Sequence, residues 1–157
     1  MNTLTQLFIL GGLFILLNFL DGLTTYINLF KLPEGLQGKE ANPLFKDIKK
    51  NFRGAMLIKA FFVMGGVWLF LELFNTAPGQ GLYLFAILDF TFGFVVLNNF
   101  YVFVRKKITK KPCTSPLGYV SKLFQKFMPL RVADILSYYL VITCLLIISI
   151  MLVNALW

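Results

Sequence analysis

Residues 18–28 read NFLDGLTTYIN and lie in the second half of an otherwise apolar segment, Leu7 to Phe30. At about 100° per residue, a helix over this segment gathers its polar side chains on one stripe, which consists of Asn18, Asp21, Thr25 and Asn28, with Thr24 beside them. A charged side chain is costly in the hydrocarbon of a membrane, so this stripe is expected to face protein or a wet cavity. The stretch therefore predicts a membrane-spanning helix with a polar site on one face.

The composition is that of an integral membrane protein. Of the 157 residues, 58% are hydrophobic, 17% are aromatic and 14% are charged, and the mean hydropathy is +0.76. The hydrophobic share exceeds that of an ordinary soluble domain. The chain is therefore predicted to be one all-α transmembrane domain over residues 1–157.

The net charge of +8 raises the question of nucleic acid. The basic residues adjoin apolar segments, however, so anionic lipid head groups are the expected partner and nucleic acid is not. Histidine is absent, which removes the usual general base and the common Ser–His and Cys–His pairs. Cys113 and Cys144 form no CxxC or CxxH motif, so neither a zinc site nor a structural disulfide is predicted. No cofactor is evident; the polar stripe suits a bound cation or lipid.

Four segments are long enough to cross a hydrocarbon core of about 30 Å, which requires roughly 20 helical residues. They cover approximately residues 7–30, 55–74, 82–104 and 134–156. Backbone hydrogen bonding inside lipid requires each span to be helical, so a four-helix transmembrane bundle is predicted. The opening residues lack the positive charge of a signal peptide, and the first span is expected to be retained. The alternative, three spans with the last segment on the membrane surface, is disfavoured by the apolar length of that segment.

The basic residues lie almost entirely in two connections, 31–54 and 105–131. Lys59 is the one Lys or Arg outside them. The positive-inside rule therefore places both connections in the cytoplasm and both termini outside a cell membrane. The basic residues expected to contact lipid head groups are Lys49, Lys50, Arg53, Arg105, Lys106, Lys107, Lys122 and Lys126.

Each basic connection contains a predicted amphipathic helix. In the first, Asn42 and Pro43 are a typical helix start, followed by the apolar face Leu44, Phe45, Ile48 and Phe52. In the second, Ser115 and Pro116 repeat this start and Pro129 is expected to end the helix, whose apolar face is Leu117, Val120, Leu123, Phe124 and Phe127. Both are expected to lie as interfacial helices in the head-group layer, and the alternative is two solvated loops.

The predicted directions of the spans bring further polar residues to the level of Asp21. Lys59 lies early in the second span and has a stem long enough to reach that carboxylate. The expected inner-leaflet polar cluster consists of Asn18, Asp21, Thr24, Thr25, Asn28, Glu40, Asn42, Lys59, Asn98 and Asn99. The alternative is a structural ion pair between Asp21 and Lys59, with Asn and Thr side chains that hold the helices together.

Asp89 lies nearer the outer end of the third span, away from this cluster. Three interpretations stay open for it. It lines an outer vestibule, it contacts another subunit, or it is a partly buried and protonated carboxyl.

Four motifs, LNFLDGLTTYINL, EANPLF, LIKAFF and LNNFYV, together resemble the small bacterial and archaeal membrane proteins grouped as domain of unknown function family 5658. The resemblance covers about residues 18–102 and rests on Asn18, Asp21, Thr25, Glu40, Ala41, Asn42, Pro43, Lys59 and Asn98 or Asn99. It implies a membrane protein but no reaction, because the family is named for lacking one. The third connection and the last span lie outside the resemblance.

Three functions fit these features. The favoured one is a transport-type or binding module whose inner cluster holds an ion or a small polar or lipid head group. The first alternative is a membrane enzyme at the cytoplasmic face, in which Asp21 and Glu40 act as metal ligands or as acid and base and Lys59 holds phosphate. The second is an accessory subunit of a larger membrane complex. The module itself is expected to form a homo-oligomer or to join such a complex.

Overall fold

The computed structural model describes residues 2–37, 50–111, 113 and 115–156. Within them the chain forms five α-helices and no β-strand. The helices are α1 (Thr3–Tyr26), α2 (Phe52–Thr76), α3 (Pro78–Thr109), α4 (Pro116–Phe124) and α5 (Leu130–Leu156). A π-helical turn, η1 (Ile27–Lys31), continues α1, and a 3-10 helix, η2 (Glu34–Leu36), follows it.

Four helical segments are long and apolar enough to cross a membrane, namely Thr3–Lys31, Phe52–Thr76, Pro78–Thr109 and Leu130–Leu156. They correspond to the four predicted spans, and they are consistent with a multi-pass membrane protein. The all-α prediction is confirmed for the described residues. Many large apolar side chains on these helices are exposed, among them Phe8, Phe61 and Ile108.

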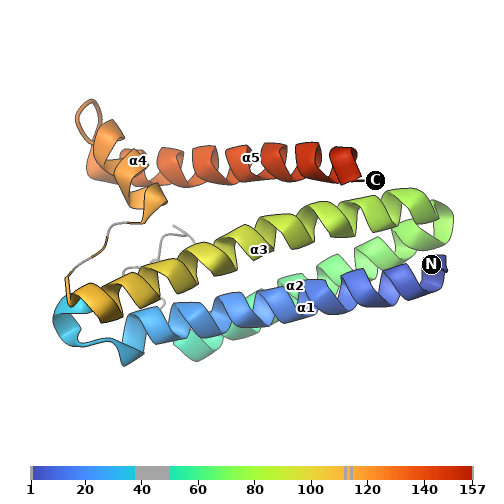
Figure 1. The fold of residues 1–157 in the computed structure, drawn as a ribbon, viewed down its shortest axis with the longest axis horizontal. Coiled ribbons are helices and arrows are strands. Elements are labelled where there is room, and N and C mark those ends of the chain that lie inside the picture. Colours follow the sequence, from blue (N-terminus) through green and yellow to red (C-terminus); the bar gives the residue numbers. More distant parts are fainter. Residues whose placement is uncertain (1, 38–49, 112, 114, 157) are drawn as a thin grey trace.

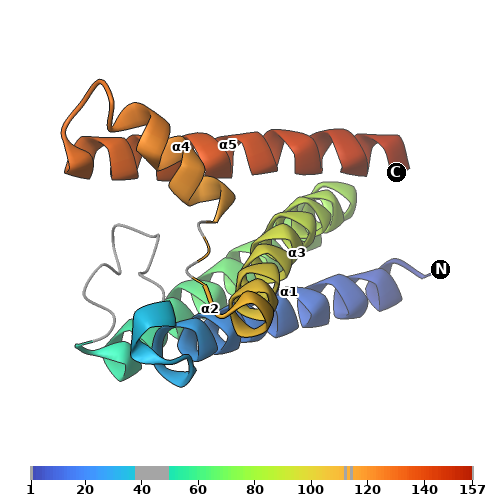
Figure 2. The ribbon, with the colours of Figure 1, turned by 60° about the vertical axis from the view of Figure 1, so that its left-hand side comes forward.

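Helix α3 lies at the centre of the arrangement. It packs against α1, α2 and α5, whereas α1 and α2 contact each other far less. Helix α5 lies on one side of α3, and α1 and α2 lie on the other (Figures 1 and 2). Both chain ends lie at the same end of the molecule. The end of η1, the start of α2 and the end of α3 lie at the opposite end (Figure 1). We call it the basic end, because these helix ends carry Lys31, Arg53 and Lys107.

The main apolar core joins the three central helices away from the basic end. Phe14 of α1 and Phe85 of α3 are both buried, with ring centroids 5.9 Å apart. Phe70 of α2 lies 4.8 Å from Phe85 and 6.2 Å from Phe14. Two edge-to-face pairs and one tilted pair of rings therefore hold all three helices together at one level.

Helices α2 and α3 form a tight hairpin. The predicted connection of residues 75–81 is reduced to Ala77, because α2 continues to Thr76 and Pro78 opens α3. Pro78 suits the first helical turn, where its missing N–H is not needed. A Cβ at Gly81 would lie 2.9 Å from Cα of Phe74, so the close approach of the two helices requires glycine there.

Helix α5 is joined to α3 by an apolar contact and by two polar ones. Ile87 and Val153 are buried together. Thr91 donates a hydrogen bond to Oγ of Ser149 at 3.0 Å, and Tyr83 donates to Oδ1 of Asn154 at 2.6 Å. Such hydroxyl and amide contacts between helices are typical of membrane bundles.

A helix, α4, is present where the second amphipathic helix was predicted. Ser115 caps it, since its hydroxyl accepts the N–H of Gly118 at 3.2 Å. The helix ends at Phe124, before the predicted stop at Pro129, and Ser121 donates a hydrogen bond to Asp134 of α5. The first predicted amphipathic helix lies mostly outside the described residues; Phe52, assigned to its apolar face, instead begins α2 after the Asn51 cap.

Candidate functional site

The carboxylate of Asp21 is the centre of the polar cluster. Its Oδ2 pairs with Nζ of Lys59 from α2, and its Oδ1 accepts a hydrogen bond of 2.9 Å from Nδ2 of Asn99 on α3. The side chains of Asp21 and Lys59 are only 17% and 19% exposed. One carboxylate of α1 therefore joins all three central helices, and each oxygen has a partner. The expected proximity of Asp21, Lys59 and Asn99 is confirmed.

Asn28 extends the cluster toward the basic end. Its Nδ2 donates to the carbonyl oxygens of Thr24 and Asn99, both at 3.0 Å. Its Oδ1 is buried without a partner among the described residues. Asn28 belongs to η1, where the π-helical turn changes the register at which side chains leave the helix. Asn28 and Asn99 therefore link η1, the continuation of α1, directly to α3.

The remaining residues of the predicted stripe make local contacts. Asn18 is buried and donates to the carbonyl of Phe14 at 2.9 Å, and Thr24 donates to the carbonyl of Asp21 at 3.1 Å. Thr25 and Asn98 are half-buried, and neither side chain hydrogen-bonds to the cluster within the described residues. Asn98 is about 100° around α3 from Asn99, so Asn99 faces Asp21 and Asn98 does not.

Three other candidates lie outside the described residues: Glu40, Asn42 and Lys49. The enzymatic alternative depends on Glu40 and stays a prediction. In the described part of the chain, His, Cys, Asp and Glu side chains form no group of three or more that could hold a metal ion.

A groove between α1 and α2 is a feature that the sequence did not predict. Its volume is about 710 Å³, and its lining is apolar apart from a few polar groups, chief among them Asn18 and Lys59. On α1 the lining recurs at helical spacing, as Ile15, Asn18, Phe19, Gly22, Leu23 and Tyr26. On α2 it extends from Phe52 to Leu71, a rise of roughly 28 Å at 1.5 Å per residue.

The groove exists because α1 and α2 are each held by α3 and approach each other closely at few points. Gly22 marks one close approach, since a Cβ there would lie 3.2 Å from Sδ of Met56. The small residues Gly22 and Ala60 were the feature of the sequence that could have indicated a groove here. Their meaning depends on the separation of α1 and α2, which a single sequence does not give.

Most of the basic residues expected to contact head groups are exposed. Lys50, Arg53, Arg105, Lys107, Lys122 and Lys126 lie on the surface. Lys106 is buried, and it faces inward on α3. Arg105 donates from Nη1 to the hydroxyl of Tyr101 at 2.8 Å, one turn earlier on α3. Contact between these residues and lipid stays a prediction.

Asp89 lies apart from the cluster, in the half of α3 nearer the chain ends. It is 5% exposed, and neither carboxylate oxygen has a hydrogen-bond partner among the described residues. A carboxylate in such surroundings carries a large desolvation cost, whereas the protonated acid does not. This placement favours the neutral buried carboxyl among the three interpretations of Asp89.

We expect Asp89→Asn to change the free energy of unfolding by less than about 1 kcal/mol, because a neutral amide replaces a neutral acid of the same shape. Chemical unfolding of the two proteins in the same detergent measures this difference. A loss of more than about 2 kcal/mol would instead mean that the negative charge of Asp89 has a partner.

Comparison with known proteins gives one match. The family model described as "Domain of unknown function (DUF5658)" matches residues 12–105. The matched region contains Asp21, Lys59 and Asn99 and the whole of α2, but it ends before α4 and α5. No curated protein and no solved structure matches the chain.

Proposed function

The chain belongs to the DUF5658 family, and we propose that it is a membrane-embedded binding module for a lipid-type ligand. The apolar body of the ligand lies in the groove between α1 and α2, and its polar group meets Asn18 and Lys59. The observation that carries this proposal is the position of an amide and an ammonium group in the wall of an otherwise apolar groove. Ligand sites are commonly apolar with a few such polar groups.

The charge of the cluster favours this ligand over a bare cation. The Lys59 ammonium already neutralises Asp21, so a second cation would meet electrostatic competition. Within the described residues Asp21 is the hydrogen-bond partner of Lys59, and an ammonium has three donors. A hydroxyl, ester or phosphate oxygen of a lipid is therefore the group that the groove can accept.

The dimensions of the groove are those of a long chain. Between Lys59 and Leu71 the groove runs for roughly 18 Å along α2, which is enough for the chain of a lipid in one leaflet of a bilayer whose hydrocarbon is about 30 Å thick. An acyl or isoprenoid chain can lie along it while its polar end points to the basic end. The groove also opens sideways between two helices, so such a ligand can enter from the bilayer.

We further propose that the basic end faces the cytoplasm of a cell membrane, with both termini outside and α4 in the head-group layer. The location of both chain ends at the end opposite Lys31, Arg53 and Lys107 supports this orientation (Figure 1). The positive-inside rule supplies its direction. Reporter fusions to the C-terminus test it, and a cytoplasmic C-terminus would contradict it.

Filling the groove tests the binding function. Ala60 lines the groove and Gly65 lies on α2 outside it, so Ala60→Phe and Gly65→Phe add the same ring at two positions of one helix. We expect Ala60→Phe to lower the amount of co-purified lipid by at least about tenfold, or about 1.4 kcal/mol of binding free energy. Gly65→Phe should bind as the unchanged protein does.

Native mass spectrometry of the detergent-extracted protein provides the measurement. It reports the mass of each bound lipid and also whether the chain forms a homo-oligomer or co-purifies with other subunits. Equal lipid occupancy in Ala60→Phe and Gly65→Phe would contradict the proposed site, provided that both proteins unfold at the same temperature.

A further inference from the structure

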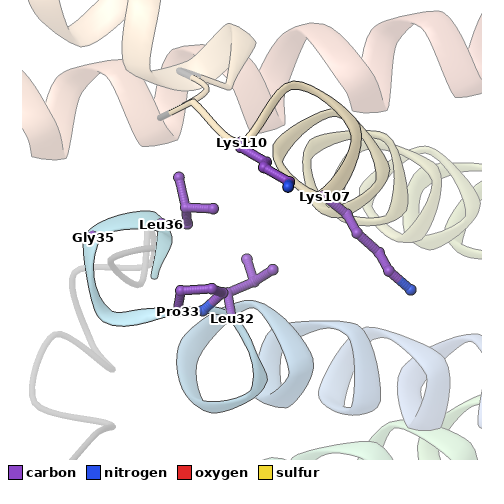
Figure 3. A pocket seen from close by; sticks show the side chains of 6 residues that line it. All are labelled: Leu32, Pro33, Gly35, Leu36, Lys107 and Lys110. Carbon is purple, nitrogen blue, oxygen red and sulfur yellow. The ribbon is translucent and has the colours of Figure 1, made fainter.

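A second pocket lies at the basic end of the molecule, separate from the groove between α1 and α2. Its volume is about 540 Å³, and it lies between the turn that follows α1 and the last turns of α3. Figure 3 shows its lining, which consists of Leu32, Pro33, Gly35, Leu36, Lys107 and Lys110. One wall is therefore apolar and comes from the turn, and the other carries two ammonium groups from α3.

The apolar wall is held in shape by its own hydrogen bonds. The N–H groups of Leu36 and Gln37 donate to the carbonyl of Pro33 at 2.8 and 3.1 Å. Nε2 of Gln37 donates to the carbonyl of Leu32 at 3.0 Å, and Leu32 itself is buried. The pocket is thus formed by an ordered turn against a helix end.

Lys110 reaches the pocket because of its backbone conformation. It has a φ of 52°, the left-handed conformation that residues other than glycine seldom adopt. Its N–H closes α3 by donating to the carbonyl of Lys106 at 3.0 Å. In Figure 3 the Lys110 side chain lies nearer to the turn, whereas the Lys107 side chain points away from it.

The charge at this corner suits an anion. Lys107 in the last turn of α3 and Lys110 at its C-cap both line the pocket, so two positive charges share one corner and repel each other. Glu34 lies on the same turn but does not line the pocket. Lys31 does not line the pocket, and its Nζ lies 5.8 Å from the centroid of the Tyr26 ring. Nζ of the exposed Lys107 lies 5.9 Å from the centroid of the Phe103 ring, so binding of an anion in the pocket would replace this contact. A phosphate between Lys107 and Lys110 would relieve their repulsion.

We propose that this pocket binds the phosphate group of an anionic membrane lipid. The pocket lies just beyond the apolar parts of α1 and α3, which is the level expected for lipid head groups. The phosphate contacts Lys107 and Lys110, and the glycerol and first chain carbons pack on Leu32, Pro33 and Leu36. An apolar wall contributes nothing to binding of a free phosphate ion, so the lipid is the expected source of the phosphate.

The experiment compares two double variants of the whole protein in detergent micelles. Lys107→Gln with Lys110→Gln removes both ammonium groups from the pocket. Lys111→Gln with Arg131→Gln removes the same charge from two exposed positions that do not line the pocket. Native mass spectrometry then measures binding of added phosphatidylglycerol, phosphatidylcholine and inorganic phosphate to each protein.

We expect the pocket variant to lose about tenfold in affinity for phosphatidylglycerol, and the control variant less than about twofold. Phosphatidylcholine should bind equally to all three proteins, because the groove is the same in each, and inorganic phosphate should not displace phosphatidylglycerol. Lys107→Arg with Lys110→Arg should retain binding. Equal losses in the two Gln variants, or displacement by inorganic phosphate, would overturn the proposal. Ala60→Phe should keep this binding, so the outcome is independent of the groove.

Discussion

Asp21→Asn is expected to lower the free energy of unfolding by about 3 kcal/mol, because it leaves the Lys59 ammonium in the bundle without its counter-ion. Lys59→Met should have a similar effect, since it leaves the carboxylate with Asn99 alone. Equilibrium unfolding in mixed micelles measures both. Glu72→Gln is the matched control, because it removes one exposed negative charge from α2 and should change stability by less than about 0.5 kcal/mol.

The double variant Asp21→Asn with Lys59→Met separates structure from binding. We expect it to recover stability to within about 1 kcal/mol of the original protein, because no unpaired charge remains. Its lipid occupancy should nevertheless stay low, because the ammonium that accepts the polar group of the ligand is gone. Recovery of both stability and lipid binding would support the alternative in which the pair only holds the helices together. A double variant no more stable than Asp21→Asn would contradict the ion-pair account.

The second large effect is expected at the aromatic core. Phe85 is 1% exposed, and its ring contacts those of both Phe14 and Phe70. We expect Phe85→Ala to lower the free energy of unfolding by about 3 kcal/mol, because a cavity opens where three helices meet. The lost free energy comes mainly from packing contacts, because the lipid chains that surround the helices are as apolar as the core and hydrophobic transfer contributes little.

Phe61→Ala provides the comparison for this prediction. Phe61 is 76% exposed on α2, so its truncation removes few contacts inside the molecule. It should change the free energy of unfolding by less than about 0.5 kcal/mol. Equal effects of Phe61→Ala and Phe85→Ala would mean that the three helices do not pack as described.

The Asp21–Lys59 contact could be predicted because a membrane limits where two charges can lie. Once the direction of each span is set, the depth of a residue in the membrane follows from the number of residues between it and the end of its span, multiplied by the helical rise. Only a few polar residues then lie at the depth of Asp21. The same reasoning placed both Asn98 and Asn99 near Asp21. It could not choose between them, because the choice depends on the rotation of α3 about its axis.

The ends of the helices were predicted less well for a related reason. Hydrophobicity marks the part of a helix that suits lipid, whereas hydrogen bonds and caps decide where the helix itself ends. Helix α3 therefore continues through Lys106 and Lys107 to Thr109, beyond the predicted span. The groove between α1 and α2 could not be predicted, because apolar side chains that line a groove and those that face lipid look alike in a sequence.

The one-residue link at Ala77 has a consequence for how the protein is made. Helices α2 and α3 are joined so closely that neither can cross a bilayer far ahead of the other. Between Lys59 and Arg105 the chain has no Lys or Arg, and Glu72 and Asp89 are its only charged residues. We therefore expect the two helices to leave the insertion machinery together, as a hairpin that carries a short, nearly uncharged turn across the membrane.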